Sequence, residues 1–254
     1  MELTFIGIIP ARYASSRFPG KPLADIGGMT MIERVYRQVS KELDDVVVAT
    51  DDERIMDAVR GFGGRAVMTS TEHRSGTDRC REAYSNMESN ADVVINIQGD
   101  EPFIAPEQIR AVKQCFIDDP TTSIATLVRR FDPALGWDAL FNPNTPKVVL
   151  DNRMNAIYFS RSIIPYVRNH EWKEWIDSAV FHTHVGLYAY RAGVLDEITR
   201  LPQSSLELAE SLEQLRWVQN GYRIKTALTD APTVGIDTPE DLERARHILL
   251  DGKL

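Results

Sequence analysis

The sequence has few cysteines, no long apolar run and no basic leader. Its only two cysteines, Cys80 and Cys115, do not follow the spacing of a metal site, and we expect both thiols to stay reduced. No apolar run approaches the roughly 18 residues that a membrane helix needs. The start Met1-Glu2-Leu3 is not basic. We therefore expect no signal peptide, no membrane span and a cytoplasmic location.

An excess of basic residues is also missing. The 254 residues include 29 Lys and Arg but 37 Asp and Glu, which gives a net charge of −8. General nucleic-acid binding usually needs a basic face, so this balance argues against it and favours a small anionic ligand. Two phosphate-binding fingerprints are absent as well. No Gly-x-Gly-x-x-Gly occurs, and Gly20-Lys21 fails the Walker A pattern at Ser15 and Pro22.

Strand and helix patterns alternate through the first half of the chain. Apolar strand patterns and helical patterns follow one another at residues 3–9, 30–42, 46–49, 65–68, 77–87, 92–97 and 106–118. Short strands that alternate with helices of about ten residues predict an α/β fold with a doubly wound, mostly parallel sheet.

The alternation stops near residue 131, where Pro- and Asn-rich loops begin. Two antiparallel strands are then predicted at 147–150 and 156–159, and a further strand at 182–190. We expect a smaller inserted α+β lobe over residues 131–204, and an α/β domain made of residues 1–130 and 205–254. Within the lobe, Trp172 and Trp175 indicate either an exposed partner surface or side chains tucked beneath it.

The first strand is followed by an unusually long basic connection. About 18 residues separate it from the next helix, where such links usually take roughly 2–6. The segment carries Arg12, Arg17 and Lys21 and almost nothing apolar. A cation-rich loop at the carboxyl end of a strand suits a polyphosphate, because Arg offers a planar fork and Lys a point charge. The alternative is a solvated surface loop.

Two carboxylates are candidates for a metal site. Asp100 follows the strand at 92–97, at the edge where parallel sheets bind ligands, although Gly99-Asp100 also suits a simple turn. Further along, Thr238 can cap the last helix with Asp241 as its reciprocal partner. That arrangement leaves Asp237 outside the helix and able to bind a cation, whereas Asp237 as the cap itself is the alternative. Mg²⁺ favours one or two carboxylates with water and substrate phosphates.

Other polar motifs are less specific. The turn 73–79 is polar and opens a helix, which suits either a nucleotide contact or a plain helix start. His182 and His184 lie on one face of a predicted strand, but no third ligand at suitable spacing supports zinc. We expect one helix over residues 206–220, in which Glu210 and Gln214 share a face. Such a pair could bind a polyol or lie on a solvated helix side.

Several of these motifs together resemble the 3-deoxy-manno-octulosonate cytidylyltransferase (CMP-Kdo synthetase) family. The resemblance runs in order from residue 9 to residue 242. It rests on the pattern Pro-Ala-Arg-x-x-Ser-x-Arg-x-Pro-x-Lys-x-Leu from Pro10 to Leu23, Ser75-Gly76-Thr77, Gln98-Gly99-Asp100-Glu101-Pro102, Tyr158-Phe159-Ser160-Arg161, the segment from His184 to Arg191, the run from Leu206 to Arg216, and Asp237-Thr238-Pro239-Glu240-Asp241-Leu242.

The resemblance implies a nucleotide-diphospho-sugar transferase-like fold and the reaction of CTP with 3-deoxy-D-manno-octulosonate (Kdo), giving CMP-Kdo and pyrophosphate for lipopolysaccharide synthesis. It implies a cytoplasmic homodimer, with Mg²⁺ held by Asp100 and Asp237. By the same resemblance, the catalytic residues would be Arg12, Lys21, Asp100 and Asp237. The nucleotide contacts would be Ala11, Arg12, Lys21, Ser75, Gly76, Arg79 and Gln98. The sugar contacts would be Gln98, Arg161, His184, Tyr188, Glu210 and Gln214.

The chain departs from the family pattern at two positions. Arg74 stands where the family usually has Gln or an equivalent, and Pro146 is not the expected residue next to the strand at 147–150. Alternative functions are the activation of a related acid sugar, such as 8-amino-Kdo or a sialic-type sugar, and the activation of a sugar phosphate with another nucleotide. A non-catalytic nucleotide-sugar binding module is a further alternative, but such a module has no need of two metal carboxylates.

Overall fold

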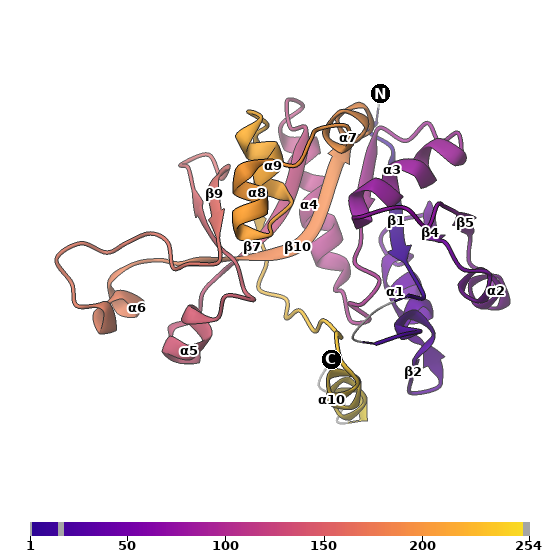
Figure 1. Ribbon diagram of the computed structural model, residues 1–254, viewed down its shortest axis with the longest axis horizontal. Helices are drawn as coiled ribbons and strands as arrows, with labels where there is room; N and C mark the ends of the chain where they lie inside the picture. Colours follow the sequence, from indigo (N-terminus) through magenta and orange to yellow (C-terminus); the bar gives the residue numbers. More distant parts are fainter. Residues whose placement is uncertain (1, 15–17, 251–254) are drawn as a thin grey trace. The chain divides into compact units, whose positions relative to one another are not determined.

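The computed structural model describes residues 2–14 and 18–250 (Figure 1). The chain divides into two compact units. Unit 1 comprises Met1–Arg110, Ala189–Thr199 and Ala231–Leu254, and unit 2 comprises Ala111–Tyr188 and Arg200–Asp230. The expected α/β class with a mostly parallel sheet is confirmed. The boundaries between these units differ from the predicted domain boundaries, which lie after residue 130 and before residue 205.

Unit 1 is organised around four parallel strands. Their order is β6-β1-β4-β5, formed by Val93–Asn96, Phe5–Ala11, Val46–Thr50 and Ala66–Met68. Gly7 of β1 pairs with Val46 on one side and with Ile95 on the other. Because all four strands run in the same direction, their carboxyl ends meet at one edge of the sheet, which is where ligands bind in such folds.

Within the described residues, unit 1 contains five complete α-helices, and side-chain caps supplied by the sequence start at least three of them. These helices are α1 (Met31–Val39), α2 (Glu53–Gly61), α3 (Gly76–Asn86), α7 (Ala192–Thr199) and α10 (Pro239–Leu250). Thr30, Asp52 and Ser75 each accept a backbone N–H of the first turn of α1, α2 and α3. Between β1 and α1 the chain forms a short 3₁₀ turn, η1 (Lys21–Leu23), and a small hairpin of β2 (Asp25–Ile26) and β3 (Met29–Thr30).

Unit 2 contains a parallel pair and an antiparallel group of strands. It begins within α4 (Pro106–Asp118), whose residues up to Arg110 belong to unit 1. Strand β7 (Ile124–Arg130) pairs with β11 (Ile224–Leu228), which explains why both segments belong to this unit. Strand β8 (Lys147–Leu150) pairs antiparallel with β9 (Ala156–Ser160) and with β10 (His182–Arg191), whose last residues lie in unit 1.

A small aromatic core lies beneath the loops of unit 2. Phe131, Leu140, Ile176 and Phe181 are buried there, and Trp175 packs against them. The core joins α5 (Gly136–Phe141) and α6 (Trp175–Ser178), which follow the short turns η2 (Pro133–Leu135) and η3 (Trp172–Glu174). Trp172 is 47% exposed. One of the two tryptophans therefore packs under the lobe, whereas the other faces solvent.

The single helix expected over residues 206–220 is wrong. Two short helices replace it, α8 (Ser205–Glu210) and α9 (Gln214–Gln219), with Ser211 left-handed at φ 49° between them. The buried carboxylate of Glu207 accepts hydrogen bonds from Nε and Nη2 of Arg216, at 2.8 and 2.5 Å, nine residues later. In a continuous helix, residues nine apart lie on opposite sides. This ion pair is compatible only with a chain that turns.

None of the helices in residues 2–14 and 18–250 has the length and apolarity needed to cross a membrane.

Candidate active site

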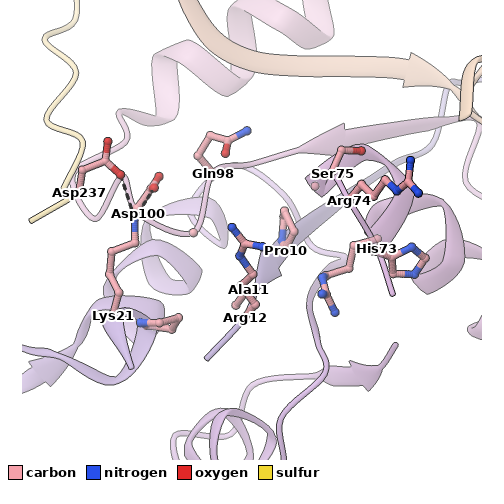
Figure 2. A pocket seen from close by; sticks show the side chains of 14 residues that line it. Pro10, Ala11, Arg12, Lys21, His73, Arg74, Ser75, Gln98, Asp100 and Asp237 are labelled. Carbon is pink, nitrogen blue, oxygen red and sulfur yellow. Dashed lines mark hydrogen bonds and ion pairs between the residues drawn. The ribbon is translucent and has the colours of Figure 1, made fainter. Parts of the chain in front are cut away.

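A pocket of about 260 Å³ lies at the carboxyl edge of the parallel strands in unit 1. Figure 2 shows how side chains from separate segments face this pocket. It is lined by Pro10, Ala11, Arg12, Lys21, Pro22, His73, Arg74, Ser75, Gly76, Arg79, Gln98, Gly99, Asp100 and Asp237. The structure therefore brings together all the residues expected to bind the nucleotide or the metal. Arg17, the remaining cation of the basic loop, lies outside the described residues.

The Lys21 ammonium group lies between two carboxylates. Its Nζ is 2.7 Å from Oδ2 of Asp100 and 3.3 Å from Oδ1 of Asp237, and it also donates to the carbonyl of Ile236 at 2.9 Å (Figure 2). The Lys21 side chain is 16% exposed. An ammonium shared by two partly buried carboxylates shows that the two acids can bind one cation together.

The turn before Lys21 explains how its side chain reaches the pocket. Gly20 adopts φ 72°, and its N–H donates to the carbonyl of Tyr13 at 2.9 Å. A Cβ at position 20 would lie 3.1 Å from the Tyr13 ring, in a backbone conformation that few L residues adopt. Glycine therefore permits the sharp turn that starts η1 at Lys21.

The capping of α10 directs Asp237 towards Lys21. Thr238 Oγ1 accepts the backbone N–H of Asp241 at 3.2 Å, and the Asp241 carboxylate accepts the N–H of Thr238 at 2.9 Å. This is the expected capping box, with Pro239 at the first helical position. Thr238 is the cap, and the alternative in which Asp237 caps the helix is excluded. The carboxylate of Asp237 is thereby available to the Lys21 ammonium.

Two polar side chains in the turn at the start of α3 form hydrogen bonds with other groups of the protein. Ser75 Oγ accepts the N–H of Asp78 at 3.1 Å. The buried guanidinium of Arg79 donates to Asp51 at 2.7 Å and to Thr69 at 2.6 Å. Both residues line the pocket, but Arg79 is already neutralised by Asp51.

Arg12 and Arg74 are the exposed arginines of the pocket. Within the part of the chain that the structure describes, neither guanidinium makes an ion pair, whereas Lys21 and Arg79 do. Arg74 and His73 were not among the expected nucleotide contacts, although both stand in the polar turn 73–79. His73 contacts the carboxylate of Glu82. The signal for Arg74 was its basic side chain directly before the Ser75 cap.

The expected sugar contacts lie in unit 2, apart from Gln98. The structure joins Arg161 and Glu210. Carboxylate oxygens of Glu210 accept hydrogen bonds from the Ser160 hydroxyl at 2.6 Å and from the backbone N–H of Arg161 at 2.9 Å. The guanidinium of Arg161 donates to the carbonyls of Glu210, Pro143 and Ser211. This uses three of its five N–H groups.

A second pair of expected sugar contacts, His184 and Tyr188, lies together on β10. Their ring centroids are 5.2 Å apart. Thr126 Oγ1 lies 3.0 Å from His184 Nε2 and 2.9 Å from the carbonyl oxygen of Leu187. Burial lowers the pKa of His184 to about 4, and the ring is therefore neutral near pH 7.

Gln214, at the start of α9, is buried at 5% exposure. Its Nε2 has no hydrogen-bond partner among the described residues. A buried amide donor without a partner is costly, and a polar ligand would satisfy it. The structure does not place Glu210 and Gln214 on one helix face, since they belong to different helices.

No group of three or more His, Cys, Asp or Glu side chains in the described ranges could hold a metal ion by itself. A metal in the pocket of unit 1 would depend on the two carboxylates near Lys21 together with ligand oxygens.

We predict that Gly99→Ala lowers both stability and ligand binding in this pocket. A Cβ at position 99 would lie 2.8 Å from the carbonyl oxygen of Pro10, a backbone atom that cannot move away alone. We expect a loss of about 1–3 kcal/mol in the free energy of unfolding, measured by urea titration. Gly61→Ala is the control, since nothing lies within 4 Å of its Cβ position. Equal stability of both variants would contradict the packing argument.

Comparison with known proteins identifies relatives of this chain. The sequence profile of the cytidylyltransferases matches residues 6–224. The 3-deoxy-manno-octulosonate cytidylyltransferase of Parabacteroides distasonis is 63% identical over 248 residues, which cover 97% of this chain and 98% of that protein. The one of Bacteroides thetaiotaomicron is 61% identical, with coverage of 97% and 98%.

Solved structures agree. A CMP:2-keto-3-deoxy-manno-octonic acid synthetase complexed with CTP superposes with a TM-score of 0.89 at 45% identity, and the match covers 99% of this chain and 100% of that chain. A putative glucose-1-phosphate thymidylyltransferase from Bacillus anthracis, at a TM-score of 0.65 and 18% identity over 97% and 96% of the two chains, shows the shared fold alone. The profile match and the 61–63% identity over 97% of this chain show that the chain belongs to the 3-deoxy-manno-octulosonate cytidylyltransferase family.

Proposed function

We propose that this protein transfers the cytidylyl group of CTP to Kdo, forming CMP-Kdo and pyrophosphate for lipopolysaccharide synthesis. The observation that carries the proposal is the Lys21 ammonium between Asp100 and Asp237, beside the exposed guanidinium of Arg12. This combination of cations and paired carboxylates suits a metal-bound polyphosphate. The names of the 61–63% identical relatives supply the nucleotide and the acceptor sugar.

The cations of the pocket would bind the triphosphate. Arg12 offers a planar set of N–H donors, and Lys21 a compact charge that can turn towards phosphate oxygens. Ala11, Ser75 and Gly76 line the same pocket and would contact the nucleoside. A Cβ at Gly76 would lie 3.2 Å from Pro10, so glycine keeps this wall close to the end of β1. Arg79 would support the wall through Asp51 rather than bind phosphate directly.

Asp100 and Asp237 are the residues that would hold Mg²⁺. They fit the ion because both carboxylates already reach one cationic group, and Mg²⁺ commonly takes one or two carboxylates plus phosphate oxygens. When bound, the ion would neutralise phosphate charge and lower the pKa of the attacking hydroxyl. The ammonium of Lys21 would then be free to face the phosphates.

The chemistry is one in-line displacement. The anomeric hydroxyl oxygen of Kdo forms a bond to the α-phosphorus of CTP, the bond from that phosphorus to the bridging oxygen breaks, and pyrophosphate leaves with the electron pair. The hydroxyl proton passes to solvent. No side chain acts as a covalent nucleophile. Arg12 and Lys21 stabilise the charge that develops on the leaving group, and positioning supplies much of the rate.

Polar groups of unit 2 would bind the sugar, and Gln98 of unit 1 stays a predicted sugar contact. Gln214 presents a buried amide donor without a partner, and Arg161 retains two N–H groups that could meet the Kdo carboxylate. Glu210, His184 and Tyr188 would contact the hydroxyl groups. The neutral imidazole of His184 suits a polyol better than an anion.

We also propose a cytoplasmic homodimer. The exposed aromatic side chains of unit 2 support an interface between copies, because a contiguous apolar patch on a surface can mark a binding site for a partner. Phe141 and Trp172, at 50% and 47% exposure, meet edge to face with ring centroids 5.9 Å apart.

The test of the proposed function is pyrophosphate release from CTP with Mg²⁺, using Kdo, its 8-amino analogue and N-acetylneuraminate as acceptors. We expect release with Kdo and much slower release with the other two. Release with another acid sugar only would keep the mechanism and change the acceptor. A folded protein that binds CTP and releases pyrophosphate with none of them would contradict the enzymatic proposal.

We predict that Asp100→Asn lowers kcat/KM by about 10²–10³-fold, since an amide binds a cation far more weakly than a carboxylate. The fold should persist, because Asp237 and the Ile236 carbonyl still accept Lys21. Initial rates over a Mg²⁺ series, with circular dichroism of the same samples, measure both effects. Asp57→Asn, on the exposed side of α2, is the control for charge. Normal rates in Asp100→Asn would remove this residue from the metal site.

We predict that Arg74→Gln raises the KM for CTP about fivefold and leaves kcat nearly unchanged. A solvent-exposed charge contact to the nucleotide is worth about 1 kcal/mol. The effect should shrink at high salt, because screening weakens such contacts. Arg60→Gln changes the net charge equally at an exposed site outside the pocket and should have no effect. Identical KM values for both variants would mean that Arg74 does not contact the nucleotide.

A further inference from the structure

Unit 2 contains a second polar cavity, of about 310 Å³, that takes no part in the proposed reaction. It lies at the amino ends of the parallel strands β7 and β11, where Ile124 and Ile224 begin their pairing. Three cationic side chains line it: Arg153, Arg223 and Lys225. The chain carries a net charge of −8, whereas this cavity is lined by more cationic than anionic side chains.

The three cations come from two segments that the backbone fixes against each other. Arg153 lies in the turn between β8 and β9, whereas Arg223 directly precedes β11 and Lys225 lies within it. Lys225 Nζ donates to the carbonyl of Arg153 at 2.6 Å. The N–H of Thr226 donates to the carbonyl of Met154 at 2.8 Å. These contacts fix the backbone that carries the three cations, without any ligand.

The neighbouring carboxylates are held in their own turns and do not neutralise the two arginines. Asp119 Oδ1 accepts the N–H of Thr121 at 2.9 Å and its hydroxyl at 2.6 Å. Asp151 accepts the backbone N–H groups of Arg153 and Asn155, each at 2.8 Å. Within the part of the chain that the structure describes, the guanidinium groups of Arg153 and Arg223 make no ion pair. Asp119 is the acidic residue that lines the cavity beside the three cations.

We propose that this cavity binds a compact phosphate-bearing anion. Two arginines offer planar forks for phosphate oxygens, and Lys225 adds a point charge at the wall. The volume is in the range of small-molecule sites and far exceeds one phosphate group, so a phosphorylated metabolite also fits. The ligand would bind in unit 2, separately from the pocket around Lys21.

The experiment measures inorganic phosphate binding by ¹H–¹⁵N spectra of the full chain at saturating CTP without metal, so that the nucleotide pocket is filled. We expect shifts confined to residues 119–125, 153–155 and 223–226. Arg153→Gln with Arg223→Gln should weaken the apparent affinity at least tenfold. Arg60→Gln with Arg168→Gln removes the same charge from exposed sites outside the cavity and should change nothing.

A second arm separates the sources of the phosphate group. Vesicles of phosphatidylcholine with a phosphatidic acid fraction are compared with free phosphate and pyrophosphate. Binding of the free anions without vesicle binding supports a soluble ligand, and vesicle binding lost in the double variant supports a lipid headgroup. The absence of shifts at these residues, or equal affinities in both double variants, would overturn the proposal. Cytidylyl transfer and thermal midpoints of the variants verify that each remains folded.

Discussion

The site of unit 1 depends on the contact of one ammonium group with two carboxylates. Without a cation between them, Asp100 and Asp237 would repel each other across a partly buried pocket. Lys21 removes that repulsion and also donates to the carbonyl of Ile236. The N–H of Ile236 in turn donates to the carbonyl of Asp100 at 3.0 Å. The segment before α10 is thereby attached to the loop after β6, although the two lie far apart in the sequence.

Local chemistry made part of this site predictable. The capping box of α10 requires only Thr238 and Asp241 three residues apart, and it leaves Asp237 outside the helix. The parallel strands follow from apolar runs that alternate with helices, and they place Arg12 and Asp100 at one edge. These arguments need no knowledge of distant contacts, and the structure agrees with them.

Contacts between distant residues account for what could not be predicted. Arg79 is neutralised by Asp51, which lies 28 residues earlier in the sequence. The sequence alone does not show this pairing, and therefore does not show which arginine stays exposed. For this reason Arg74 was not predicted as a nucleotide contact. The break between α8 and α9 has the same origin. Leucine spacing favours one continuous helix, but the buried pair of Glu207 and Arg216 and the left-handed Ser211 require two. The spacing of apolar residues does not show how much a buried ion pair contributes to stability.

The division of the chain into two units has an evolutionary consequence. The groups proposed for the triphosphate and the metal belong to unit 1, whereas those proposed for the sugar, except Gln98, belong to unit 2. Substitutions that reshape the turn at Ser211 would move Glu210 and Gln214 independently, because the two residues lie on separate helices. Acceptor preference can thus diverge among descendants of one ancestor while the nucleotide chemistry is inherited unchanged.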